Sequence, residues 1–179
     1  MAREKQVWYD ENDGALVDAT VHAIRTLAGG AATAVSQTPT ITAGAYSAGD
    51  ALGGKLTFAG AARAAGGTGV IHSVVLTDAA KQDANIDLVL FDQDFTATAD
   101  NAAFDPSDED LANVIGIIPI LSSDYADFND NSAANVRQVG MVFKCNGTGT
   151  SLYGQMVIRD GDTYAATDDV TVKLLILQD

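Results

Sequence analysis

Short runs of alternating apolar and polar residues, joined by connectors rich in Gly/Ala or Asp/Asn, constrain the fold of this chain most. Between residues 48 and 94, three such runs follow one another: LGGKLTF, GVIHSVVLTD and NIDLVLFDQD. Near the C-terminus, residues 170–177 place Val, Val, Leu and Ile at every second position. Alternation with period two is typical of strands with one buried face. The pattern predicts a β-rich fold.

Eight strands are predicted from residue 38 onward, without helical segments alternating between them. They are expected at residues 38–43, 52–58, 69–77, 86–91, 113–121, 138–145, 151–159 and 170–178. Because βαβ units are absent, a doubly wound α/β fold is excluded. We predict an all-β fold, an antiparallel β-sandwich, with a jelly roll of about eight strands as its topology.

The connectors carry turn signals of different strength. Asn146-Gly147 and Asp160-Gly161 are the residue pairs that favour tight β-hairpins. Two connectors are long, residues 92–112 and 122–137. Pro119 interrupts a predicted strand, and since proline has no amide hydrogen to donate, that strand is expected at a sheet edge or at a bulge.

Two serines mark places where a connector should turn helically. Ser107 is followed three residues later by Asp110, a pattern similar to a capping box, which predicts a single helical turn. Ser122 begins a second segment, SSDY, for which a helical turn is also predicted.

The first 37 residues are expected to form an N-terminal arm and a flexible connector, and residues 38–179 the sandwich domain. In the polar segment 1–13, Trp8 and Tyr9 are the large apolar side chains. Aromatic residues bury much area at small entropic cost, so they could anchor the arm on a neighbouring surface. They could equally fold back on their own domain, and the sequence favours neither alternative.

Charge and cysteine content exclude several kinds of partner. The 179 residues include 24 acidic and 10 basic ones, for a net charge of −14. Direct binding of nucleic acid or of anionic membranes needs clustered Lys and Arg, so neither is expected. Cys145 is the single cysteine, so an intrachain disulfide is impossible, and its place at the end of an apolar run predicts a thiol that is buried or at the rim of the core. The N-terminal residues lack the apolar core of a secretory signal, and synthesis in the cytoplasm is expected.

Groupings that would support catalysis are not found, and we expect no enzyme and no cofactor. His22 and His72 are the two histidines, and neither stands in a recognisable triad or zinc motif. Calcium is the one ion for which oxygen ligands are abundant, although turn formation explains these side chains better. The calcium candidates are Asp92, Asp94, Asp105, Asp108, Asp110, Asn129, Asp130, Asn131, Asp160 and Asp162.

Five segments together resemble a family of small virion proteins of tailed bacteriophages. They are AGDALGGKLTF, GVIHSVVLTDAAKQDANIDLVLFDQDFT, DNAAFDPSDEDLANVIGIIPI, SLYGQMVIRD and DDVTVKLLILQD, and the resemblance covers roughly residues 38–179. It implies a structural role in the virion, with decoration (cementing) of the capsid as the foremost role, and it carries no catalytic residues.

The resemblance leads to expectations about partners and contacts. A decoration protein would bind the major capsid protein on the outer surface of the head, as a homo-oligomer, for which a trimer is expected. The arm and the two long connectors are the expected contact surfaces. The aromatic side chains expected to make these contacts are Trp8, Tyr9, Phe104, Tyr125 and Phe128. A tail, neck or receptor-facing component of the virion, and a carbohydrate-binding sandwich, are the alternatives.

Overall fold

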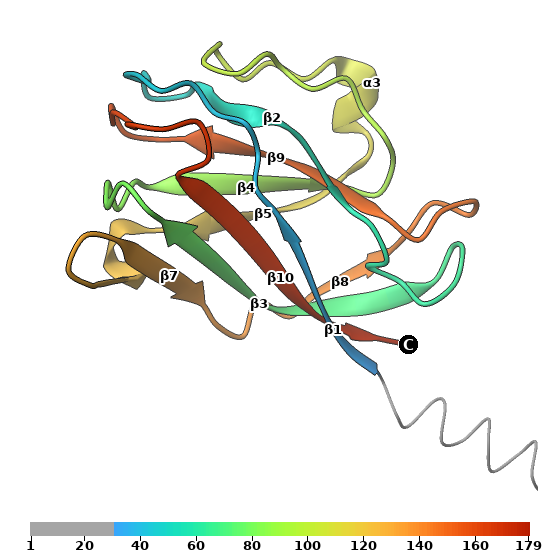
Figure 1. The fold of residues 1–179 in the computed structure, drawn as a ribbon. Helices are drawn as coiled ribbons and strands as arrows, with labels where there is room; N and C mark the ends of the chain where they lie inside the picture. The colour runs from blue at the N-terminus through green and yellow to red at the C-terminus, as the bar shows by residue number, and fades with distance from the viewer. Residues whose placement is uncertain (1–30) are drawn as a thin grey trace, which may run out of the picture. The chain divides into compact units, whose positions relative to one another are not determined.

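Two antiparallel sheets contain the strands of residues 31–179, the part of the chain that the computed structural model describes (Figure 1). In the first sheet the order is β1 (Ala31–Gln37), β10 (Val170–Gln178), β3 (Thr68–Asp78), β7 (Ser132–Val136) and β6 (Tyr125–Asp127), and β8 (Met141–Lys144) also pairs with β3. In the second sheet the order is β2 (Ala51–Phe58), β9 (Leu152–Ile158), β4 (Ile86–Phe91) and β5 (Val114–Ile120). The predicted all-β fold with antiparallel sheets is confirmed, and it is consistent with a sandwich.

Helical structure is limited to single turns in the described residues. The turn α3 (Asp108–Leu111) is capped by Ser107, whose side chain accepts a hydrogen bond from the amide of Asp110. A 3-10 turn covers Ser122–Asp124. Both predicted helical turns are therefore confirmed. Within residues 31–179, no helix has the length and the hydrophobicity of a membrane span.

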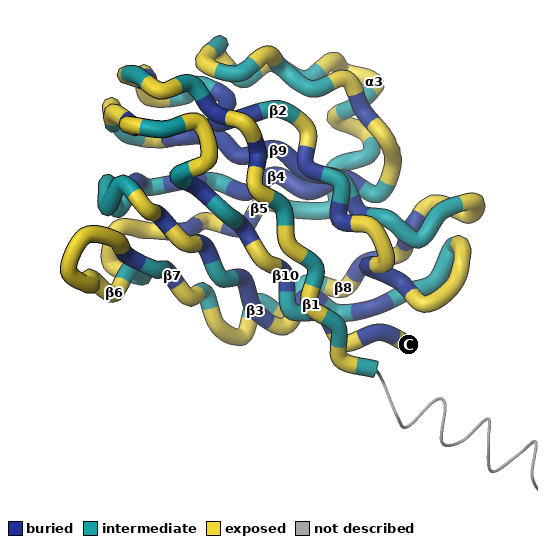
Figure 2. The backbone as a smooth tube through the Cα atoms, in the orientation of Figure 1, coloured by how far each residue is buried: buried dark blue, intermediate teal, exposed yellow. Residues whose placement is uncertain are grey.

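The main hydrophobic core is built from alternate residues of both sheets. Along β10, Val170, Val172, Leu174 and Ile176 are buried, while the residues between them are exposed or half-buried. They belong to one cluster with buried residues of β4 and β9 from the other sheet. In Figure 2 the buried residues accordingly follow the strands, and the loops are mostly exposed. Burial of this apolar face is the main driving force for the fold.

The second sheet is buried on both faces in its centre. Val89, Phe91 and Val157 belong to a smaller cluster that includes Phe95 of the 92–112 connector. Their neighbours along β4 and β9 face the main core, so by alternation this smaller cluster lies on the outer face. The continuous apolar run of β4 is explained by this cover on both sides.

Seven of the eight predicted strands, all those from residue 52 onward, coincide with observed strands to within three residues. The interpretation of Pro119 is confirmed as well. It lies in β5, which is the edge strand beyond β4, and Asp87 is its register partner.

Two predictions near the start of the described residues are wrong, one for residues 31–37 and one for residues 38–43. The strand lies at Ala31–Gln37, where a flexible connector was expected, and residues 38–43 contain no strand. Pro39, which is buried, has no amide hydrogen to donate to a sheet ladder. Because β1 pairs with β10, its weakly apolar residues are ordered by a neighbour far away in the chain.

The two predicted hairpins are also wrong. The turn at Asn146-Gly147 lies between β8 and β9, and the one at Asp160-Gly161 lies between β9 and β10. Each connects a strand of one sheet to a strand of the other. The dipeptides do lie in the connections, but long-range packing decides which strands pair.

The 122–137 connector is more structured than the sequence indicates. It contains the short strands β6 and β7, which pair with each other through a tight connection in which the amide of Phe128 donates to the carbonyl of Asn131 at 2.8 Å. Strands of three and five residues, rich in Ala, Ser and Asp, are too short and too polar to show a clear alternation.

Candidate functional site

The 92–112 connector lies over the outer face of the second sheet, and ring stacking and side-chain hydrogen bonds hold it there. It leaves the end of β4 at Phe91 and returns to β5. The ring of Phe95 stacks on that of Phe91, with centroids 3.9 Å apart and planes 15° from parallel. Phe104, half-buried, packs against the same cluster. Stacked and buried aromatic rings of this kind hold a connector without regular structure in place.

Gln155 of β9 clamps the middle of this connector. Its side chain is fully buried, and its Nε2 donates to the carbonyl oxygens of Thr98 at 2.6 Å and Gly53 at 2.9 Å. Its Oε1 accepts from the amide of Thr98 at 3.0 Å. One side chain thus satisfies both backbone groups of Thr98, as a β-strand neighbour would.

Asp100 joins the same connector to β2 and to the loop that precedes it. Its Oδ1 accepts from the amide of Gly53 at 2.6 Å and from the hydroxyl of Tyr46 at 2.7 Å, and its Oδ2 accepts from the hydroxyl of Thr42 at 2.6 Å. Burial, together with the Asp100 carboxylate, raises the pKa of Tyr46 above its ordinary value, so the phenol keeps its proton and remains a donor.

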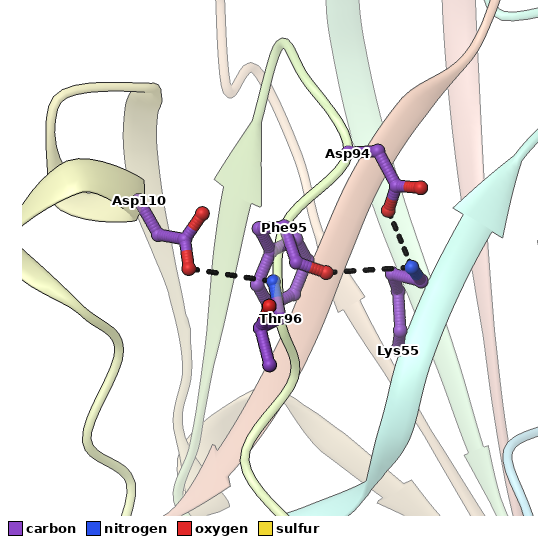
Figure 3. Close-up of polar contacts among 5 residues, drawn as sticks. All are labelled: Lys55, Asp94, Phe95, Thr96 and Asp110. Carbon is purple, nitrogen blue, oxygen red and sulfur yellow. Dashed lines mark hydrogen bonds and ion pairs between the residues drawn. The ribbon is translucent and has the colours of Figure 1, made fainter.

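Both ends of the connector carry further polar contacts, which Figure 3 shows. Lys55 of β2 forms an ion pair with Asp94, and its Nζ also donates to the carbonyl of Phe95 at 3.3 Å. The hydrogen bond from Lys55 lowers the pKa of the Asp94 carboxyl below its ordinary value. At the other end, Oδ2 of Asp110 accepts from the amide of Thr96 at 3.3 Å.

The surface that the connector presents is acidic. Asp105, Asp108 and Glu109 are exposed, and a groove of about 630 Å³ is lined by residues 96–98 and 105–110. Leu111, at the end of α3, is 51% exposed. A rigid, acidic surface with an exposed apolar side chain beside it is suited to contact with another macromolecule.

The second long connector, residues 122–137, contains two of the aromatic residues predicted as contacts, Tyr125 and Phe128. Tyr125 is half-buried, and its hydroxyl donates to the carbonyl of Ala84 at 3.1 Å. Burial, and then the nearby carboxylates with Asp78 foremost, raise the pKa of Tyr125. Phe128 follows β6 directly and is 58% exposed. The carbonyl of Phe128 accepts from Nζ of Lys81 at 2.9 Å, which fixes the backbone below the exposed ring.

Of the five aromatic residues predicted as contacts, the three that the structure describes are not brought together. Trp8 and Tyr9 lie outside the described residues. Phe104 and Tyr125 anchor their own connectors, and Phe128 presents its ring to solvent.

Sequence reasoning did not identify Gln155 or Asp100. A signal was present for Gln155, which is the one polar amide inside the otherwise apolar run LYGQMVI. Asp100 stands among many aspartates and carries no distinguishing pattern.

The calcium candidates do not assemble into a cluster. Among residues 31–179, no three His, Cys, Asp or Glu side chains lie together in a way that could hold a metal ion. Several candidates instead take part in structural contacts: Asp94 pairs with Lys55, and Asp160 accepts two hydrogen bonds from Asn85. The predicted burial of Cys145 is confirmed, and burial raises the pKa of its thiol.

Comparison with known proteins adds no relative: no protein-family model matches the chain, and no curated protein matches it significantly. Function must therefore be argued from the residues and their arrangement.

Proposed function

We propose that this protein is a structural component of a tailed-bacteriophage virion that decorates the outside of the head and stabilises it against the pressure of the packaged DNA. It binds the major capsid protein, assembles as a homotrimer, and acts by binding rather than by catalysis. It does not bind nucleic acid or membrane directly. The motif resemblance over residues 38–179 supports this proposal, and so does the acidic composition, with a net charge of −14.

We also propose that the sandwich is a jelly roll. In support of this, β1 lies beside β10, β2 beside β9, β3 beside β8, and β4 beside β5, with the pairs alternating between the two sheets. A double ribbon of eight strands wrapped in this way is the pattern of a jelly roll, an architecture found in viral capsid proteins. The hairpin of β6 and β7 is then an insertion between β5 and β8.

The observation that best supports the proposed binding role is that side-chain hydrogen bonds hold the 92–112 connector in place. The Gln155 and Asp100 side chains make six hydrogen bonds in the described part of the chain. Two of them hold Thr98 of this connector, three join Asp100 of the connector to β2 and to the loop before it, and one joins Gln155 to Gly53 of β2. Such preorganisation lowers the entropic cost of binding, because the surface is already in one conformation. Phe128, exposed on a fixed backbone, supplies a second contact group.

Co-sedimentation of the purified full-length protein with heads that lack it tests the proposal. We expect saturable binding with hundreds of copies per head, and a raised temperature of head disruption. Phe128→Ser should weaken binding at least tenfold, because aromatic anchors dominate interfaces. Ile117→Ser removes a side chain of similar exposure, 53%, from the edge strand β5 and serves as the matched control.

Two results would overturn the proposal. One is the absence of binding to heads, with the protein found on tails in small copy number instead. The other is saturable binding to cell-surface glycans, which would indicate a carbohydrate-binding sandwich.

A further inference from the structure

The outer face of the first sheet differs in charge from the rest of this acidic protein. Among the residues of its six strands, Asp78 is buried toward the core, and Asp127 of β6 is the single carboxylate on an exposed position. Asp127 lies on the edge strand and pairs with Lys81 at 3.4 Å. Within β10, β3 and β8, the strands at the centre of this face, no exposed residue is therefore acidic.

The same face holds cations that have no carboxylate partner in the described part of the chain. Lys144 of β8 and Lys173 of β10 are exposed and form no ion pair there, and Arg137, directly after β7, is also exposed and unpaired. Lys55, Lys81 and Arg159, by contrast, each pair with an aspartate. Unpaired cations on a protein of net charge −14 create a local field of opposite sign to the whole.

An apolar row crosses the centre of this face. The strand register places Leu177 of β10 opposite Val70 of β3, and Val70 opposite Val142 of β8. Leu177 is 45% exposed and Val142 is 70% exposed. A shallow groove of about 400 Å³ adjoins the row, lined by parts of β1 and β10 and by His72. Exposed apolar residues that stand in a row and adjoin a groove are typical of an interaction surface.

The complementary surface exists on the same molecule. On the outer side of the second sheet, α3 presents Asp108 and Glu109, with Leu111 two residues further along the chain, and all three are exposed. One surface is thus apolar with a cationic rim, and the other has an apolar side chain beside acids.

We propose that the outer face of β10, β3 and β8 in one copy binds the α3 surface of a second copy, head to tail. Contact between two like faces is disfavoured, because it would bring Lys144 and Lys173 against their equivalents, or the acids of α3 against theirs. A heterologous contact of this kind closes into a ring when its rotation permits. These two surfaces would form the interface of the homo-oligomer in the proposed function. The inference rests on that function only for its biological setting.

Sedimentation velocity of the full-length protein, without phage heads, tests the contact. At concentrations up to about 1 mM, which detects even weak association, we expect species heavier than the 18.5 kDa monomer. Raising NaCl from about 0.05 M to about 0.5 M should weaken the association, because exposed charges are screened.

Charge reversal on each surface gives the sharper result. Lys144→Glu with Lys173→Glu, and separately Asp108→Lys with Glu109→Lys, should each weaken self-association by about tenfold or more. An equimolar mixture of the two double variants should associate again, because each restores the opposite charge for the other. Arg63→Glu and Asp130→Lys, at exposed positions outside both surfaces, are the matched controls.

Three results would overturn the inference. They are a wild type that stays monomeric across the concentration range, double variants that associate as the wild type does, and a mixture that fails to associate although each variant keeps the wild-type melting temperature. Because no heads are present, these outcomes are independent of head binding, and either proposal can fail alone.

Discussion

Replacement of Gln155 by Met tests whether one buried amide holds the 92–112 connector on the sandwich. Methionine has a similar length and tolerates irregular packing, so the change removes the hydrogen bonds with little loss of volume. It leaves the carbonyl of Gly53 and both backbone groups of Thr98 without their partner.

The expected cost follows from the burial of those groups. A hydrogen bond contributes about 1 kcal/mol net, and a buried group left without a partner costs about 1–3 kcal/mol. Gly53 is buried, so leaving its carbonyl without a partner has the full cost. Thr98 is half-buried, so water can replace part of the hydrogen bonding that it loses. We therefore expect a loss of about 2–4 kcal/mol, equivalent to a decrease in melting temperature of about 5–15 °C for a chain of this size.

Urea unfolding measures the global loss, and hydrogen exchange by mass spectrometry locates it. Exchange should accelerate in residues 96–105 of Gln155→Met and stay slow in β4. Gln93→Met is the matched control, since Gln93 lies in the same connector but is exposed and bonds only to the side chains of Asn113 and Asn146. The reasoning is refuted if Gln155→Met unfolds within about 0.5 kcal/mol of the wild type and exchange in the connector does not change.

Three further predictions concern acids and the thiol. Asp100→Ala should lower the free energy of unfolding in urea by about 3 kcal/mol, because three donors lose their acceptor, whereas Asp130→Ala at an exposed position should change it by less than about 0.5 kcal/mol; equal effects would contradict the assignment. Burial raises the pKa of Asp162 above its ordinary value of 3.8, so its unfavourable contribution to stability grows as the pH rises from that ordinary value to the raised pKa and is constant above it. The melting temperature of the wild type, taken relative to that of Asp162→Asn, should therefore be higher at about pH 4 than at about pH 7.5. Taken relative to the exposed variant Asp168→Asn, it should not show this fall. The buried thiol of Cys145 should react with Ellman's reagent only as the protein unfolds in urea, and fast reaction of the native protein would show that it is accessible.

Elements defined by local chemistry could be predicted well from the chain alone. The alternation in β10, the apolar run of β4 and the cap at Ser107 each arise from residues a few positions apart, and all three have the predicted structure. Pro119 likewise lies on an edge strand, because the missing amide hydrogen is a property of that residue wherever it occurs.

Pairing between distant segments could not be predicted in this way. The strand β1 is ordered through β10, more than 130 residues away, and Asn146-Gly147 connects two sheets although its dipeptide favours a hairpin. A turn motif encodes the direction of the chain over four residues, whereas the choice of partner strand depends on which apolar faces meet.

The sequence by itself determined the β-rich class, the positions of seven strands and the acidic character, because each depends on side-chain type and short-range spacing. Only the tertiary structure decided that Gln155 and Asp100 hold the connector, and that Lys144, Lys173 and the row of Leu177, Val70 and Val142 share one face. The physical reason is that hydrogen bonds and strand register act over a few ångströms in space, between residues that are far apart in the chain, such as Leu177 and Val70, which 107 positions separate.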